Sequence, residues 1–478
     1  MAAARFFFRA RSYLPAFNAG IKGGFVMSNH TGKTIKLLDI LVLGFAFFAT
    51  YFGAGNLIFP PYLGLNSGSD WLEGIIGLTA SGIFLPLFAL VIIGFYGDVH
   101  RLTDRVGKYT YNVILAALMV ACTFVAVPRT CATAIELGIQ GNLPLAPFMP
   151  IAVVYFILTY FLVSDENSVL DKIGKYLTPF LAIILVVIGI MGIVKPLGTP
   201  AEPDVANAFV NAFLGGYNTG DVLVSFLMAV IFIGTVKNKG YAKPSDRKKV
   251  MLLCSGVAFV LLLIIYGSLL FMGACVSGEY PQSIGRAELL VAVIKRVGSS
   301  VMIPMGIAVC LACLTTAVGE TAAVADFFSK AFKQKISYKK VAIISCICST
   351  VTAMLGVDGI VTYIGWIFSV EYPPMLAIMI LAVLGRLVPN DGAWKGSVWL
   401  VGIYSFLESF PFLSNLSFAK EVVALAPLSS YGFGWIAPFI IGFILGAILW
   451  KVTGKSSLKF ADEDEEAAYE KEKTEIIC

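Results

Sequence analysis

The first long apolar run of the chain is interrupted by the stretch FGAGNLIFPP, residues 52–61. Two glycines beside an asparagine are a poor place for a continuous helix, and two prolines follow almost at once. A second stretch of this kind, GGYNTGD, occupies residues 215–221 inside another apolar run. Each interruption lies inside an apolar run, so the fold depends on what these runs are and on where the breaks lie within them.

The composition identifies the solvent of these runs as a lipid bilayer. Hydrophobic residues make up 58% of the 478-residue chain and charged residues 14%, with a mean hydropathy of +0.85. A soluble domain carries about 25% charged residues, so an ordinary water-soluble fold is excluded. A spanning helix needs about 20 mostly apolar residues, and the sequence predicts an all-α polytopic membrane protein with twelve transmembrane helices. Their expected ranges are 37–59, 72–96, 111–135, 148–163, 175–194, 206–236, 250–273, 300–328, 339–355, 359–384, 396–412 and 434–450.

The positive charges predict the orientation. Basic residues are concentrated in the segments that face the cytoplasm if both termini are inside, as the positive-inside rule requires. One further arginine, Arg129, lies within a span. The predicted outer loops hold only five of the 35 Lys and Arg residues: Lys195, Arg286, Lys295, Arg296 and Lys420. We therefore expect a cell-membrane protein with a disordered cytoplasmic N-terminal segment (1–36), a membrane domain (37–450) and a charged cytoplasmic tail (451–478).

The two interruptions lie at matching depths in the membrane. Lys36 at the inner surface precedes Gly53 by about 17 residues, or ~25 Å of helix. Asp221 precedes Lys237 by about 16 residues, or ~24 Å. One helix runs outward and the other inward, as expected for the first helices of two five-helix halves with opposite topology. Such paired breaks indicate the central site of a transporter.

A helix break at this depth has a specific physical consequence. Unwound backbone is tolerated inside a membrane only where it lines a cavity, because each freed polar group would cost several kcal/mol in lipid. Amides at the start of a half-helix, here Ala54, Gly55 and Asn56, suit a carboxylate, and freed carbonyls suit a monovalent cation. The alternative is that the glycines only allow close helix packing. The matched depth of the two breaks favours a binding site.

Two buried charges accompany the breaks. Arg129 needs an acidic partner, and Asp221 is the nearest carboxylate in depth. We expect a structural Arg-Asp brace rather than direct contact of Arg129 with substrate, because an arginine there would compete with a bound cation. Glu136 is the alternative partner. In the outer loops, residues 286–297 are expected to form a short surface helix.

The stretch at 52–61 resembles the motif of the branched-chain amino acid:cation symporters, within the amino acid/polyamine/organocation superfamily. Four more stretches resemble that family in the same order, and the resemblance covers the chain from about Asp39 to Trp450. These stretches are Pro128–Thr130, Gly216–Asp221, Thr315–Gly319 and Tyr372–Pro374.

The resemblance implies a leucine-transporter-like fold of two inverted five-helix repeats, 37–194 and 206–384, with two further helices in 396–450. It implies import of leucine, isoleucine and valine together with a cation, usually sodium, by alternating access. No organic cofactor, nucleic acid or obligate protein partner is implied.

The same resemblance implies a Na⁺ site between the first and eighth helices. Its ligands would be the carbonyls of Ala49 and Phe52 and the hydroxyls of Thr315 and Thr316. These are the hard oxygen ligands that such a cation needs. The alternative is that both hydroxyls only hydrogen-bond to the preceding helical turn.

The substrate is expected at the breaks themselves. Its carboxylate would meet Gly53, Ala54, Gly55 and Asn56, with Thr219 from the second break nearby. Its apolar side chain would lie in a pocket for which Phe226 is a candidate by position.

Glu320 and Glu371 depart from the family pattern, which has apolar residues at these places. An intramembrane carboxylate is costly and faces a cavity or a partner. Glu320 is therefore expected to bind the cation or carry a proton, which leaves proton coupling open. Glu371 could instead reach water near the outer end of its helix.

Other classes of function fit less well. An intramembrane enzyme would need a nucleophile with a base or a metal centre, and the chain has only two histidines, His30 and His100. A channel would need rings of pore-lining groups. The remaining alternative is a symporter of the same fold for another neutral amino acid or an amine, which Glu320 would suit.

Overall fold

The computed structural model describes residues 35–53, 56–164, 169–454 and 456–458, and the side chains of these residues except 169–179. Every regular element in these ranges is a helix, which confirms the predicted all-α class. The predicted N-terminal segment 1–36 lies outside the described residues except for its last two positions. Most of the predicted tail, from residue 459 onward, does so as well.

The first half of the chain fills its five predicted spans with helices. The first span is α2 followed, after the break, by α3. A short 3₁₀ turn, Gly68–Asp70, then leads into α4 and α5, which occupy the second predicted span. The bounds are α2 (Leu37–Tyr51), α3 (Phe59–Ser67), α4 (Trp71–Leu78), α5 (Leu85–Tyr96), α6 (His100–Val106), α7 (Thr110–Ala121), α8 (Val127–Thr133), α9 (Phe148–Ser164) and α10 (Val169–Val194).

Wide helical turns accompany two prolines of this half. Pro86 in α5 and Pro128 in α8 each stand in the first turn of their helix. Each helix is preceded by a π-helical stretch, η4 (Thr79–Phe84) or η5 (Cys122–Ala126). Proline lacks an N–H and its ring crowds the carbonyl four residues back, and a π turn changes the hydrogen-bonding pattern at that place. The helical course therefore continues on both sides of each proline.

The second half repeats the pattern of a broken first helix, α11 and α12. The predicted surface helix at 286–297 is α14, so that prediction is confirmed. Between α16 and α17 the chain bends by 102°. The bounds are α11 (Ala208–Tyr217), α12 (Asp221–Asn238), α13 (Pro244–Ala274), α14 (Arg286–Val297), α15 (Met302–Ala331), α16 (Tyr338–Ala353), α17 (Gly356–Tyr363) and α18 (Trp366–Leu384).

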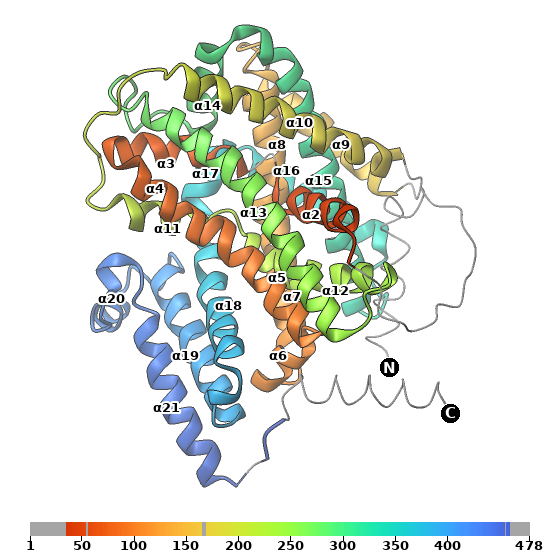
Figure 1. The fold of residues 1–478 in the computed structure, drawn as a ribbon, viewed down its shortest axis with the longest axis vertical. Coiled ribbons are helices and arrows are strands. Elements are labelled where there is room, and N and C mark those ends of the chain that lie inside the picture. The colour runs from red at the N-terminus through yellow and green to blue at the C-terminus, as the bar shows by residue number, and fades with distance from the viewer. Residues whose placement is uncertain (1–34, 54–55, 165–168, 455, 459–478) are drawn as a thin grey trace.

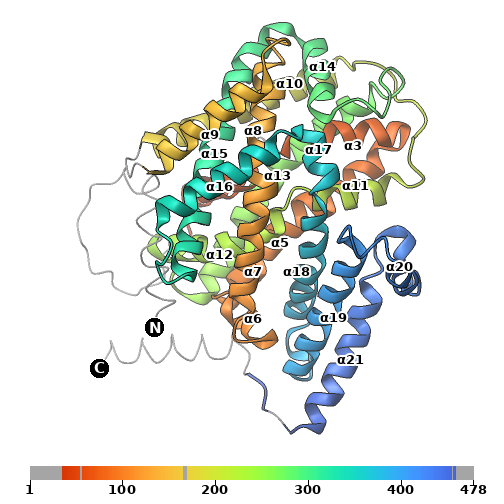
Figure 2. The same cartoon turned by 180° about the vertical axis from the view of Figure 1, so that it is seen from behind.

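The last two long helices, α19 (Asp391–Ser409) and α21 (Ile436–Val452), form a pair at one edge of the bundle, beside α18 in both views (Figures 1 and 2). The short α20 (Ser417–Ala424) lies between them in the chain. A Cβ atom on either glycine of the 392/396 pair in α19 would meet the backbone of the 442/446 pair in α21, and the reverse also holds. Glycines four residues apart on both helices thus let the backbones touch, as is typical of membrane helix pairs.

The length and apolar character of the helices describe a multi-pass membrane protein. Among the described residues, six helices are long and apolar enough to cross a membrane, or seven if the bent pair of α16 and α17 is one span. Four shorter apolar helices accompany them: Leu37–Tyr51, Phe148–Ser164, Phe180–Val194 and Ile436–Val452.

Candidate functional site

The second break separates α11 from α12 by three residues. Thr219 and Gly220 donate their amides to carbonyls of the last turn of α11, at 3.2 and 3.1 Å. Gly220 has a φ of +75°, a left-handed conformation that favours glycine, and α12 begins at the next residue, Asp221. The carboxylate of Asp221 therefore stands in the first turn of a half-helix, where the helix dipole favours negative charge.

The first break is described on both sides of Ala54 and Gly55, which lie outside the described residues. The Gly53 amide donates to the Tyr51 carbonyl at 3.1 Å, and the Asn56 amide donates to the Gly53 carbonyl at 2.9 Å. The backbone amide of Asn56 was expected to be free for a carboxylate, but it is used by this hydrogen bond within the break. Among the described residues, a Cβ atom placed on Gly53 would come near the Asn56 side chain alone, at 4.0 Å, so these residues leave space beside Gly53.

Asn56 joins the two breaks. Its Nδ2 donates to both carboxylate oxygens of Asp221, at 3.1 and 3.2 Å. Its Oδ1 accepts a hydrogen bond from Nη2 of Arg129 at 3.2 Å. All three side chains are buried, with exposed fractions of 5% each. We call Asn56, Arg129 and Asp221 the helix-break cluster, since it shows directly that the two predicted breaks meet.

Arg129 also holds the backbone of the second break. Nη1 donates to the Asn218 carbonyl at 2.5 Å and Nη2 to the Thr219 carbonyl at 3.4 Å. Its guanidinium carbon lies 5.2 Å from the ring centre of Phe59 and 5.9 Å from that of Phe368, within the range of cation–π attraction.

The predicted Arg-Asp brace is therefore indirect. In the described part of the chain no ion pair joins Arg129 to Asp221, and the amide of Asn56 lies between them. A planar amide with a donor at one end and an acceptor at the other satisfies both charges at once. The alternative partner, Glu136, instead accepts a hydrogen bond from the Val357 amide at the start of α17, at 2.9 Å.

A second polar region lies on α15, and we call Thr315, Thr316 and Glu320 the α15 cluster. Glu320 is close enough to Arg129 and to Asp221 to interact electrostatically with both. Oε2 of Glu320 is buried and has no hydrogen-bond partner among the described residues.

Glu371 lies near the start of α18 and is partly exposed, while its Oε2 is buried without a partner in the same part of the chain, so the expectation that it reaches water stays a prediction. Unlike Glu320, it is not among the carboxylates that act on Arg129.

The two threonine hydroxyls form hydrogen bonds to the preceding turn of their own helix, as in the alternative to a Na⁺ site. Thr315 and Thr316 both donate to the Ala312 carbonyl, at 2.9 and 3.0 Å. Each hydroxyl uses its only proton in this way, and its oxygen lone pairs can still bind a cation. No hydrogen bond within the described residues links these hydroxyls to Ala49 or Phe52, and Ala49 lies on an exposed face of α2.

The two remaining predicted substrate residues are buried. Thr219 has an exposed fraction of 5%, and its hydroxyl donates to the Gly216 carbonyl at 2.9 Å. Phe226 on α12 is completely buried.

Sequence reasoning missed the hydroxyl groups that support the cluster. The Tyr51 hydroxyl is 2.9 Å from the Ser225 hydroxyl, which is 2.9 Å from the Asp221 carbonyl. The Tyr266 hydroxyl donates to the Tyr51 carbonyl at the end of α2, at 3.3 Å. The chain has 19 tyrosines, and nothing in the sequence distinguishes Tyr51 and Tyr266 from the others.

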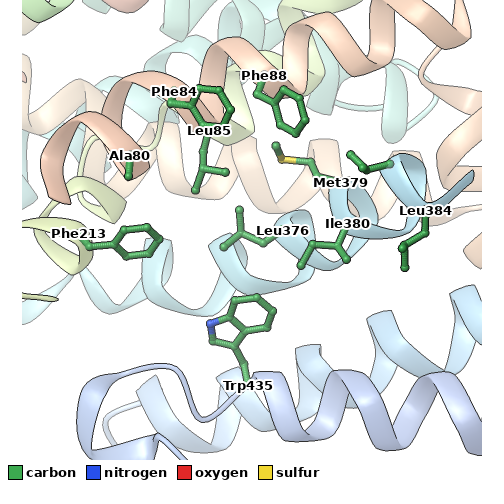
Figure 3. A pocket seen from close by; sticks show the side chains of 11 residues that line it. Ala80, Phe84, Leu85, Phe88, Phe213, Leu376, Met379, Ile380, Leu384 and Trp435 are labelled. Carbon is green, nitrogen blue, oxygen red and sulfur yellow. The ribbon is translucent and has the colours of Figure 1, made fainter. Parts of the chain in front are cut away.

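Two cavities lie near the breaks and differ in character. One, of about 500 Å³, is lined by apolar side chains of η4, α5, α11 and α18 and by Trp435, which precedes α21 (Figure 3). The other, of about 310 Å³, lies between α3, α11, α18 and Arg286 at the start of α14, and its lining includes asparagines. Phe59 and Asn218, which both contact Arg129, line the second cavity, so it borders the helix-break cluster.

Comparison with known proteins places this arrangement in a family. Residues 36–453 match the family model described as branched-chain amino acid transport protein. The branched-chain amino acid permease BrnQ of Bacillus subtilis is 30% identical over 443 residues, covering 87% of this chain and 98% of that protein. The permease of the same name from Corynebacterium glutamicum is 29% identical, covering 88% and 97%.

Solved structures show the fold. The inward-facing conformation of Mhp1 superposes with a TM-score of 0.58 at 14% identity, covering 94% of this chain and 99% of that chain. MhsT in complex with L-phenylalanine gives a TM-score of 0.52 at 18% identity, covering 87% and 100%. These likenesses confirm a leucine-transporter-like fold. With the family match over most of its length, the chain belongs to the family of branched-chain amino acid transport proteins and is a transporter, not an enzyme.

Proposed function

We propose that the protein is a secondary active symporter that imports leucine, isoleucine and valine together with a cation, Na⁺ in the first place, by alternating access. The observation that carries the proposal is the junction of two broken helices at Asn56, Arg129 and Asp221 in a chain of this family. Broken helix pairs of this kind hold substrate and ions in transporters.

The proposed architecture has twelve spans, arranged as two inverted five-helix repeats (37–194 and 206–384) with two helices in 396–450. The first repeat begins with the break between α2 and α3, and the second with the break between α11 and α12, which supports this division. The orientation places both termini in the cytoplasm of a cell-membrane protein, because the predicted outer loops contain few Lys and Arg residues.

The substrate carboxylate would be held by the amides of Ala54 and Gly55, since the neighbouring Asn56 amide is used inside the break. The space beside Gly53 supports a ligand at this place. The ammonium group would face the partly negative end of α2. The aliphatic side chain would lie toward the apolar residues of α12, where Phe226 is the candidate contact.

Na⁺ would bind the Thr315 and Thr316 hydroxyls together with the Ala49 and Phe52 carbonyls. Both hydroxyls donate to Ala312, which turns their lone pairs away from that carbonyl. One specific observation favours a second candidate function. The buried, unpartnered oxygen of Glu320 would suit proton coupling, or an amine in place of a neutral amino acid.

Uptake of labelled leucine into proteoliposomes tests the proposal. An imposed inward Na⁺ gradient should drive accumulation above the equilibrium level, and isoleucine and valine should compete. Leucinol, which lacks the carboxylate, should compete poorly. Accumulation driven by a proton gradient alone would replace Na⁺ by H⁺, and absence of leucine uptake under every gradient would contradict the assigned substrate.

A further inference from the structure

The 500 Å³ cavity has a different lining from the helix breaks. It is formed by apolar side chains of four helical elements and by the indole ring of Trp435. Figure 3 shows Phe84 and Phe88 on one side of it and Leu376 and Ile380 on the other. The ionised groups of an amino acid would lose their hydration here without gaining partners from this lining. The cavity therefore suits a hydrocarbon group rather than the transported substrate.

The cavity opens at the surface of the helix bundle. Three of its lining residues, Phe84, Ile380 and Val383, have exposed fractions of 47%, 36% and 58%, whereas Leu376 is 4% exposed. The three exposed residues belong to two of the helical stretches that are long and apolar enough to cross a membrane. Exposed apolar side chains on such helices face lipid, so the cavity opens sideways into the bilayer.

An apolar cavity that opens into a bilayer is filled by hydrocarbon. A water molecule needs two to four polar partners, which this lining does not provide. Empty space would leave the lining atoms without dispersion contacts. The cavity follows α18 from Leu376 to Leu384, which is ~12 Å of helix. The hydrocarbon of one leaflet is ~15 Å deep, so the cavity has room for much of the length of one acyl chain.

A positive charge stands beyond one end of the cavity. Leu384 lines the cavity and is the last residue of α18. The exposed Arg386 follows on the 3₁₀ turn η8 (Gly385–Leu387). In the proposed orientation this end of α18 is cytoplasmic, where anionic headgroups attract basic residues at the membrane surface. An apolar cavity with an arginine beyond its end complements a molecule that has a hydrocarbon chain and a negatively charged headgroup.

We propose that this cavity binds one acyl chain of an anionic phospholipid from the cytoplasmic leaflet, with the headgroup phosphate at Arg386. The inference goes beyond the proposed function. It rests on the proposed orientation for the choice of leaflet, and it does not depend on the identity of the amino acid or of the coupling ion.

The bound chain would lie against two helices that pack together beside the second break. Phe213 of α11 lines the cavity, and its ring centre is 5.8 Å from that of Tyr217, the last residue of the same half-helix. Tyr217 in turn stacks on Tyr372 of α18, with ring centres 4.0 Å apart. The lipid chain would therefore extend the packing between α11 and α18 toward the bilayer.

Quenching of tryptophan fluorescence by brominated lipids tests the inference, because bromine atoms on an acyl chain quench an indole only at short range. The chain has six tryptophans, so variants that keep one each, with phenylalanine at the other five positions, report on single places. Trp435 lines the cavity and is 5% exposed. Two tryptophans of α19 that do not line it are the controls: Trp394, which is fully buried, and Trp399, which is 61% exposed.

The full-length variants are reconstituted into liposomes of phosphatidylcholine and phosphatidylglycerol with brominated acyl chains. Despite its burial, Trp435 should be quenched as strongly as the exposed Trp399, whereas Trp394 should be protected. In the protein with its other tryptophans intact, Trp435→Phe should remove more of the quenched fluorescence than Trp394→Phe. This second comparison does not require multiple replacements.

Filling the cavity should exclude the chain. Ala80 and Val383 both line it, and Figure 3 labels Ala80 on the side opposite α18. Ala80→Phe and, independently, Val383→Phe should each lower the quenching of Trp435 toward that of Trp394. The quenching of Trp399 should stay the same in both variants.

The headgroup is tested by placing bromine on one lipid at a time. Brominated phosphatidylglycerol in unbrominated phosphatidylcholine should quench Trp435 more than the reverse mixture. Arg386→Gln should abolish this difference. Lys451→Gln is the control, because Lys451 is also exposed, lies in the last turn of α21 and does not line the cavity.

The outcomes separate the lipid site from the proposed function. Quenching of Trp435 no stronger than that of Trp394 overturns the site, and so does quenching that neither Ala80→Phe nor Val383→Phe changes. Equal quenching by the two lipids overturns the headgroup assignment to Arg386. Leucine uptake by the same liposomes tests the proposed function alone, since its failure leaves the quenching result as it is.

Discussion

At the helix-break cluster, Asp221 accepts two hydrogen bonds from Asn56, and Arg129 donates to three oxygens. On α15, by contrast, Glu320 keeps one buried oxygen without a partner in the described part of the chain, and the two threonines bond only to their own helix. Both regions consist of polar side chains inside an otherwise apolar helix bundle. The difference indicates that the first region holds the helices together, whereas the second has oxygens to offer an ion.

The largest effect is expected from Arg129→Gln. This change removes the cation that interacts with both Asp221 and Glu320, and it leaves the buried Asp221 facing the repulsion of the second carboxylate. Breaking a buried charge arrangement by removing one partner costs about 3–5 kcal/mol. The amount of protein in the membrane, and the unfolding temperature of the purified protein, should both fall strongly.

Arg296→Gln is the matched control for this variant. Arg296 and its partner Glu279 are both more than a third exposed, and such pairs contribute less than about 1 kcal/mol. If both arginine variants were equally stable, the helix-break cluster would not have the structural role inferred here.

A second change in the same cluster should partly reverse the first. Asp221→Asn added to Arg129→Gln removes one of the two carboxylates that lost their cation. Residues in one hydrogen-bonded network show coupling energies of about 0.5–3 kcal/mol. The double variant should therefore be more abundant in the membrane than Arg129→Gln alone. Strictly additive losses in a double-mutant cycle would show that Asp221 acts independently, for example by binding the substrate ammonium.

The breaks could be predicted from the sequence, but the contact between them could not be specified. Glycine, asparagine and proline have local conformational preferences, so GAGN and GGYNTGD indicate breaks without knowledge of the fold, and the helical rise gives their depth. Asn56 and Asp221 are 165 positions apart. Their bond depends on how the packing of the whole bundle brings the two breaks together. Charge reasoning therefore paired Arg129 directly with Asp221, because a neutral amide between them has no charge to reveal it.

Glu320→Gln should affect transport more than stability. The change removes a partly exposed carboxylate whose buried Oε2 has no hydrogen bond in the described part of the chain, so membrane abundance should stay near that of the wild type. If Glu320 binds Na⁺, the half-saturating Na⁺ concentration should rise about tenfold or more, since interactions with charged groups contribute about 1.5–3 kcal/mol. In the wild type, lowering the pH should raise the half-saturating Na⁺ concentration because protons compete for the carboxylate. The variant should lose this dependence.

Glu371→Gln is the control for Glu320→Gln. Glu371 is also an intramembrane carboxylate with a buried, unpartnered oxygen, but it does not act on Arg129. Its Na⁺ dependence and pH dependence should match those of the wild type. Equal shifts in both variants would assign the effect to intramembrane charge in general rather than to the α15 cluster.

The smallest effect is expected from Thr316→Val, which keeps the shape of the side chain and removes its hydroxyl. A neutral oxygen contributes about 1 kcal/mol, so the half-saturating Na⁺ concentration should rise about fivefold, while leucine affinity at saturating Na⁺ changes less. Thr350→Val on α16 is the control, because the Thr350 hydroxyl likewise bonds to the preceding turn, at 2.7 Å from the Cys346 carbonyl. If the two threonine variants have the same Na⁺ dependence, the Thr316 hydroxyl serves its own helix only. Glu320 would then be the only member of the α15 cluster for which a role in ion binding is still proposed.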